Sequence, residues 1–207
     1  MTLLKDSSFE AERGFTMTEL MASVAIVGII SSIAIPSFTD QAAKARQNES
    51  TATVSQIQTR IATYADEFGA LPTTWKELND TSAIMTTNGP ANQENFDPIT
   101  LAGGNYKVGI RNKDNLFTLV AINPSSQNLD REQCDGDYGD ITFSECGELN
   151  FEQCIDAFTD SPNPVISNDM CGSRPIAACL NLTNGASEVK KIENISEEVE
   201  VVSPNCG

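Results

Sequence analysis

Residues 13–38 read RGFTMTELMASVAIVGIISSIAIPSF, and this stretch decides how the rest of the chain is organised. From Leu20 to Thr39 there are twenty residues without a formal charge, most of them apolar. A helix rises about 1.5 Å per residue, so this run covers roughly 30 Å, the thickness of the hydrocarbon core of a bilayer. The run therefore predicts a membrane-spanning helix.

One acidic residue, Glu19, stands directly before the uncharged run, and Gly14 and Phe15 precede it after a short polar leader. A carboxylate at membrane depth costs on the order of a few kcal/mol unless it finds a partner. Glu19 is therefore a candidate functional residue, and we expect its charge to be poorly compensated, or neutralised by a proton, while it lies in the bilayer.

The combination of Gly14, Phe15 and Glu19 resembles the signature of type IV pilins and pseudopilins, the N-methylphenylalanine type with a class III prepilin signal. FTMTEL stands where that family most often has FTLIEL. The resemblance implies cleavage of a leader after Gly14, methylation of Phe15, and a role for Glu19 with Phe15 in subunit assembly. Gly28 and Pro36 also match the family's helix, and low helix propensity and a missing hydrogen bond predict a flexible segment between them; a packing glycine and a membrane kink are the alternative. The resemblance is specific over residues 13–40 and looser afterwards.

Two other readings of the N-terminal segment compete with this one. A secretory signal peptide has a basic start and a core of about 7–15 apolar residues, whereas this leader has two bases against three acids and a longer apolar run. A plain single-pass anchor explains the hydrophobicity but not Gly-Phe followed by a lone acid. Bases flank both ends of the run equally, so the cytoplasmic leader and outer globular part come from the resemblance alone.

The acidic composition excludes some function classes. The 207 residues carry a net charge of −16, and residues 130–207 contribute four bases and sixteen acids. A field of this sign repels phosphate backbones and argues against a general nucleic-acid binder. The chain has no histidine, the commonest general base and metal ligand, and it lacks nucleophile and phosphate-loop motifs. We expect no enzyme activity and no cofactor.

All six cysteines lie in the last 74 residues: Cys134, Cys146, Cys154, Cys171, Cys179 and Cys206. An even number in an acidic, loop-rich segment beyond a membrane signal indicates disulfides in an oxidising compartment. The cysteine spacings include no C-x-x-C pair, which argues against a zinc site. Fifteen pairings are open; one interpretation joins the near neighbours Cys134 and Cys146 and staples the tail through Cys179 and Cys206. Free buried thiols are the alternative.

The helix is expected to continue from about Met17 to Ala70, where Gly69 and Pro72 end it. Its soluble half has apolar residues at helical spacing, which predicts one buried face: Val54, Ile57, Ile61, Tyr64 and Phe68. Such a face needs a partner, and a sheet is the natural one. Trp75 and Leu78 are expected to anchor the following segment on the core.

Beyond the helix, residues 79–105 are polar and predict a surface loop. Tyr106, Val108 and Ile110 alternate with polar residues, and Leu116–Ile122 follows a four-residue turn, so a hairpin is expected. Further strands are expected at Asp140–Phe143 and Val199–Val202. The acidic cluster Asp135, Asp137 and Asp140 lacks the glycine and glutamate of an EF-hand, which favours a solvated turn over a calcium site.

We therefore expect an α+β fold, in which a long N-terminal helix packs on a small antiparallel sheet with a disulfide-stapled C-terminal region. The expected divisions are these: leader, 1–14; membrane and assembly half of the helix, 15–39; globular domain, 40–207, with helix 40–70, loop 71–105, hairpin 106–123 and Cys-rich acidic region 124–207.

The resemblance implies a type IV pilus subunit that polymerises with copies of itself. Expected partners are a prepilin peptidase and methyltransferase, an assembly platform with its ATPase, and the membrane before assembly. The expected location is the inner membrane, then an extracellular fibre. The alternatives are a minor pilin or type II secretion pseudopilin, and a membrane-anchored binding module that never polymerises.

Overall fold

The computed structural model describes residues 14–81, 83–123, 143–167, 171–172, 174–192, 195 and 198–207, with no side-chain description for 143–150. The chain forms two compact units, Met1–Ala43 and Lys44–Gly207. We describe each unit by itself. The expected domain boundaries after residues 14 and 39 remain predictions.

The helix α1 comprises Met17–Phe68. Gly69, in the left-handed conformation with φ of +64°, follows its last residue, and the Gly69 N–H donates to Ala65 O at 3.0 Å. This is the glycine-terminated helix end that the sequence predicts, two residues earlier than expected.

Within Lys44–Gly207, α1 has the predicted buried face. Val54, Ile57 and Ile61 are completely or almost completely buried. Tyr64 is partly buried. Phe68, however, is 60% exposed and stacks on the Tyr64 ring at 4.7 Å between centroids. Its assignment to the buried face was wrong, because the buried stripe ends one turn earlier.

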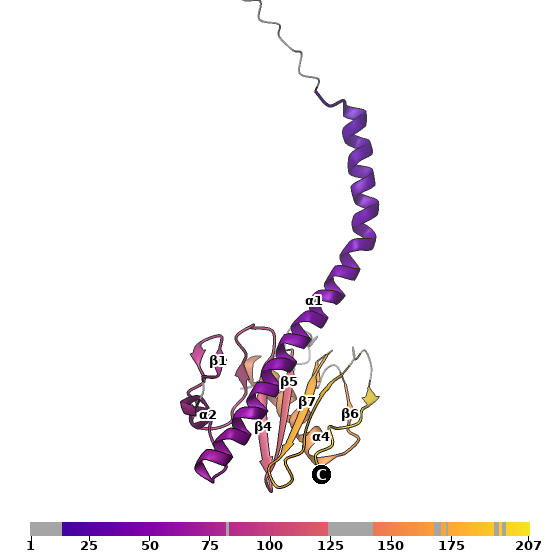
Figure 1. The fold of residues 1–207 in the computed structure, drawn as a ribbon. Coiled ribbons are helices and arrows are strands. Elements are labelled where there is room, and N and C mark those ends of the chain that lie inside the picture. Colours follow the sequence, from indigo (N-terminus) through magenta and orange to yellow (C-terminus); the bar gives the residue numbers. More distant parts are fainter. Residues whose placement is uncertain are drawn as a thin grey trace, which may run out of the picture. The chain divides into compact units, whose positions relative to one another are not determined.

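Five antiparallel strands form the main sheet in the order β3-β4-β5-β7-β8 (Figure 1). Their bounds are β3 Ile99–Thr100, β4 Lys107–Lys113, β5 Leu116–Ile122, β7 Ile176–Asn181 and β8 Ser187–Lys191. β4 and β5 are the predicted hairpin. Asp114 and Asn115 form its two-residue turn with φ of 51° and 67°, as a tight turn matched to strand twist requires.

Both faces of the sheet are covered, which explains the nearly continuous apolar sequence of β5. Phe117, Leu119 and Ala121 join the core that includes the buried face of α1. Val120 and Ile122 point the other way and join a second core with α4 (Phe143–Asp160). The sheet thus lies between the C-terminal part of α1 and α4 (Figure 1).

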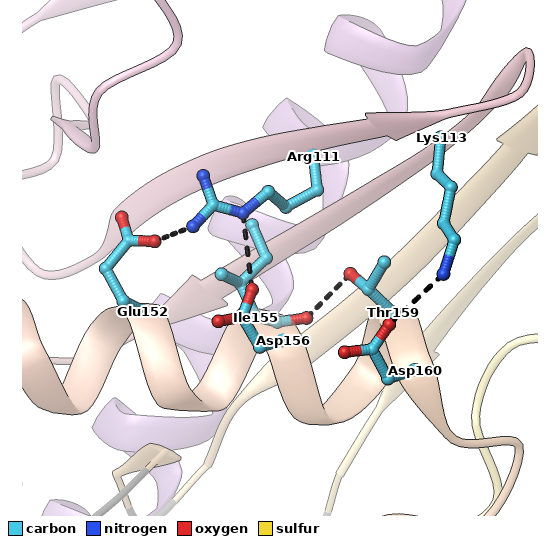
Figure 2. Close-up of polar contacts among 7 residues, drawn as sticks. All are labelled: Arg111, Lys113, Glu152, Ile155, Asp156, Thr159 and Asp160. Atoms are coloured by element: carbon cyan, nitrogen blue, oxygen red, sulfur yellow. Dashed lines mark hydrogen bonds and ion pairs between the residues drawn. The ribbon is translucent and has the colours of Figure 1, made fainter.

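α4 was not predicted, and its first residue, Phe143, corrects part of the strand expected at Asp140–Phe143. The rest of that expected strand lies outside the described residues. α4 packs through Phe151, Cys154, Ile155 and Phe158, whose spacing of three, one and three residues is helical. Its exposed side carries acids that pair with β4: Arg111 with Glu152 and, at 3.3 Å, Asp156; Lys113 with Asp160 at 3.3 Å (Figure 2).

The segment after α1 is anchored as predicted but is less irregular than expected. Trp75 and Leu78, in the short helix α2 (Trp75–Thr81), are fully buried, and Trp75 Nε1 donates to Asp97 O at 2.8 Å. The expected loop 79–105 contains β3 and a two-stranded ribbon of β1 (Met85–Thr86) and β2 (Gly89–Pro90). These strands are two residues long, too short for an alternating pattern to predict them.

Two disulfides join elements of the C-terminal region, Cys154–Cys171 and Cys179–Cys206. The second is the pair predicted to staple the tail. The other predicted pair, Cys134–Cys146, falls on residues whose side chains are not described. The strand expected at Val199–Val202 corresponds to β9 (Val199–Glu200), which pairs with β6 (Val165–Ile166).

Candidate functional site

The candidate site lies at the start of α1, in the unit Met1–Ala43. Gly14, Phe15 and Thr16 precede the first helical residue, Met17, and have no regular secondary structure. Phe15 is 88% exposed. The Gly14–Phe15 peptide bond is thus outside the helix and accessible, as hydrolysis of that bond requires.

Glu19 and Thr16 bond to each other reciprocally across the first turn of α1. The Glu19 carboxylate accepts the Thr16 N–H at 2.9 Å and the Thr16 hydroxyl at 2.8 Å. In return, Glu19 N donates to Thr16 Oγ1 at 3.2 Å, and Leu20 N donates to Thr16 O at 3.1 Å. This is a capping box with Thr16 as the N-cap, which satisfies amide groups that have no partner inside the helix.

In the structure, the capping box gives Glu19 hydrogen-bond partners within its own chain; its predicted state in the bilayer, poorly compensated or protonated, stays a prediction. Its carboxylate accepts two hydrogen bonds and lies in the first turn, where the helix dipole favours a negative charge. Thr16 was missed as a site residue. The signal was present in the sequence as Thr-x-x-Glu before an apolar run.

The apolar side chains that follow are exposed along the helix. None of the apolar stretch of α1 is buried, and, among the described residues, α1 is the one helix long and apolar enough to cross a membrane by length and composition. The large exposed side chains from residue 20 onward are Leu20, Met21, Val24, Ile26, Val27, Ile29, Ile30, Ile33, Ile35 and Phe38. An apolar surface of this size needs lipid or other protein to cover it.

Several hydroxyl groups within this apolar stretch are satisfied inside the helix. Three hydroxyls donate to backbone carbonyls at 2.7–2.9 Å: Ser23 to Glu19, Ser32 to Ile29 and Thr39 to Pro36. Such bonds remove the cost of bringing hydroxyls into a medium without water. The side chains therefore allow the segment to reside in a membrane or among other apolar helices.

Gly28 and Pro36 lie inside this part of α1. A Cβ atom at position 28 would meet nothing within 4 Å, so packing inside this unit does not require glycine there. Pro36 lacks the N–H that would bind the carbonyl one turn earlier, yet the helix continues through it. Their predicted role in flexibility remains a prediction.

Metal binding has no support in the described part of the chain. There, no group of three Asp, Glu or Cys residues is placed to hold an ion. The acidic cluster Asp135, Asp137 and Asp140 lies outside the described residues.

Comparison with known proteins matches the segment that carries this geometry. Residues 11–35 match the family described as "Prokaryotic N-terminal methylation motif". The chain is also 33% identical over 115 residues to a fimbrial protein from Pseudomonas aeruginosa, covering 54% of this chain and 68% of that protein. This chain belongs to the type IV pilin family.

Other relatives match this pilin over a smaller share of their own length. Fimbrial protein Q of Moraxella bovis is 30% identical over 102 residues, covering 48% of the pilin and 64% of the relative. The type IV major pilin protein PilA of Myxococcus xanthus is 37% identical over 70 residues, covering 29% and 32%. The pilin thus spans about two thirds or less of the length of these relatives. No solved structure matches it.

Proposed function

We propose that this chain is the structural subunit of a type IV pilus, cleaved after Gly14, methylated at Phe15 and polymerised through the N-terminal part of α1. The observation that carries the proposal is the exposed apolar surface of α1, which begins directly after Phe15 and Glu19. Fimbrial proteins and a major pilin among the relatives support the same class.

The apolar segment requires two successive environments under this proposal. Before assembly, lipid covers it, and the chain is held in the inner membrane as a single-pass precursor. In the fibre, the same side chains pack against those of neighbouring copies, so that burial is retained when the subunit leaves the membrane. Partners of this transfer are the prepilin peptidase and methyltransferase and an assembly platform with its ATPase.

Glu19 has a different partner in each environment. In the single chain, its carboxylate caps the helix through Thr16. Cleavage creates a positively charged amine on Phe15, and in the fibre the Glu19 carboxylate pairs with the Phe15 amine of a neighbouring copy. Pairing the Glu19 carboxylate with the Phe15 amine avoids the free-energy cost of burying either charge alone. The pairing also fixes the axial position of one subunit relative to the next. Gly28 and Pro36 let the intervening helix adapt to this packing.

Substitution of Glu19 tests the proposal. We expect Glu19→Ala to be inserted and cleaved but to yield few sheared surface fibres, whereas Glu67→Ala, which removes an exposed acid at the other end of α1, yields normal amounts. Gly14→Ala is expected to leave an uncleaved precursor. Normal fibres from Glu19→Ala contradict the assembly role, and correct cleavage of Gly14→Ala contradicts the assigned bond.

The quantity of the protein in sheared fibres separates the competing functions. A major subunit dominates such fibres, a minor pilin or secretion pseudopilin is scarce in them, and a non-polymerising anchored module is absent.

A further inference from the structure

We infer that Thr16 is a positioning residue for leader removal: its capping box with Glu19 ends α1 at Met17 and keeps the Gly14–Phe15 bond outside the helix. The inference rests on the proposed cleavage at this bond. It assigns a role to Thr16, which is not one of the two residues joined by the bond to be cleaved.

The need for a helix stop follows from the sequence of the leader. The last leader residues before Gly14 favour a helix. Glu10, Glu12 and Arg13 have good helix propensity, and Ala11 is the best helix former of all residue types. Gly14 alone opposes propagation of α1 into them, since glycine in a helix interior is unfavourable relative to alanine. A second stop signal close to the bond therefore has a clear use.

The contacts at Thr16 provide that stop. The Thr16 hydroxyl accepts from Glu19 N at 3.2 Å, and the Glu19 carboxylate holds the Thr16 N–H at 2.9 Å. The N-cap residue has non-helical backbone angles, so this arrangement terminates the helix at its own position. The Thr16 N–H is also occupied by Glu19, and is not available to continue the helical hydrogen-bond pattern upstream.

Phe15 is left free by the same arrangement. Phe15 and Leu20 occupy the positions that form a hydrophobic staple in many helix starts. Phe15 is nevertheless 88% exposed and Leu20 57% exposed, so the two do not bury each other in such a contact. The residue that follows the bond is accessible to a peptidase, while the residue after it is fixed.

The reaction that benefits is amide hydrolysis. The oxygen of a water molecule bonds to the Gly14 carbonyl carbon, the bond to Phe15 N breaks, and the products are the Gly14 carboxylate and the Phe15 ammonium. An attacking oxygen needs a carbonyl that is not enclosed in helical hydrogen bonds. In this inference only the capped chain can be cleaved. Removing the cap therefore lowers the fraction of precursor chains that the peptidase can cleave, which raises KM and leaves kcat unchanged.

The test measures cleavage of full-length precursor in detergent by membranes that contain the prepilin peptidase. Thr16→Ala removes the cap, Thr16→Asn replaces it with another good N-cap residue of different shape, and Thr18→Ala removes a threonine inside the helix as the control. We expect KM to rise by up to about fivefold for Thr16→Ala, and to match wild type for the other two. An unchanged KM for Thr16→Ala, or a rise in Thr16→Asn equal to that in Thr16→Ala, overturns the inference.

A measurement without peptidase separates this inference from the proposed function. Backbone chemical shifts of Gly14 and Phe15 in the precursor are expected to be non-helical in wild type and Thr16→Asn, and to move toward helical values in Thr16→Ala. Non-helical shifts in Thr16→Ala contradict the role of the cap. If the shifts behave as expected but wild type is not cut at Gly14–Phe15, the proposed function fails instead.

Discussion

Gly109 of β4 lies directly against the ring of Phe151 of α4. A Cβ atom on residue 109 would be 2.4 Å from Phe151 Cε1 and 2.8 Å from Cζ. Phe151 is 1% exposed and belongs to the core that α4 shares with β5. This contact between a glycine and an aromatic ring sets how closely α4 approaches the sheet.

Gly109→Ala is therefore expected to lower the free energy of unfolding by about 1–3 kcal/mol, because the added methyl group overpacks the interface between α4 and β4. Chemical denaturation of the full chain in detergent measures it. Gly103→Ala is the matched control, since its nearest contact is a carboxylate oxygen of the exposed Glu49 at 3.2 Å, which can move. Equal stability of Gly109→Ala and wild type contradicts the packing described here.

Gln58 ties α1 to the sheet through a polar contact. Its Nε2 donates to Cys179 O at 2.7 Å and to Glu188 O at 3.3 Å, and the side chain is 5% exposed. Gln58→Leu is expected to cost about 1–3 kcal/mol of unfolding free energy, because both carbonyls lose a buried donor. Gln56→Leu changes an exposed glutamine on the same helix and is expected to stay within about 0.5 kcal/mol of wild type. A similar loss in both variants contradicts the assignment.

Tyr106 is expected to make stability fall at high pH. Burial raises its pKa to about 12, although the positive charge of Arg174 lowers it, and its hydroxyl donates to Arg174 O at 2.9 Å. Below about pH 10 the tyrosine is protonated in both the folded and unfolded chain. Between about pH 10 and 12 the unfolded chain releases this proton and the folded chain keeps it, so the unfolding free energy decreases as pH rises.

Tyr106→Phe removes that pH dependence and, separately, lowers stability at every pH through the lost hydrogen bond. The measurement is unfolding free energy from pH 9 to 12, compared with Tyr64→Phe, in which the slope should persist. If the unfolding free energy of Tyr106→Phe falls with pH as steeply as that of wild type, the pH dependence comes from other groups and the prediction is wrong.

The ion pairs between β4 and α4 are expected to contribute little. Arg111 and its partner Glu152 are 43% and 40% exposed, and exposed pairs are screened by water and salt (Figure 2). Arg111→Gln should lower the unfolding free energy by less than about 1 kcal/mol, with no difference from wild type at about 1 M salt. A loss of more than about 2 kcal/mol, or one that persists in high salt, shows that these pairs hold α4 in place.

The long helix α1 and the hairpin of β4 and β5 were the parts most accessible from sequence. Local signals determine it: the uncharged run from Leu20, the glycine at position 69, and the alternation around the Asp114-Asn115 turn all act over a few residues. α4 was missed because the cysteines and acids of its segment indicated loops, although Phe151, Ile155 and Phe158 have helical spacing. The order of β7 and β8 in the sheet depends on pairing between distant segments, which no local pattern specifies.

At the candidate site, the sequence predicted roles for Gly14, Phe15 and Glu19 but not the capping contact between Glu19 and Thr16. The burial cost of a lone acid before an apolar run points to Glu19 alone, whereas the capping box depends on the three-residue spacing between Thr16 and Glu19. The partner in the fibre belongs to another copy, so a single chain cannot show it.

Mass spectrometry of the N-terminal peptide, taken from sheared surface fibres, tests the central claim most directly. The account predicts that this chain is an abundant component of the fibres and that its first residue is Phe15, carrying one methyl group on its amine. A mature chain that begins at any other residue, or fibres without this chain, would contradict it.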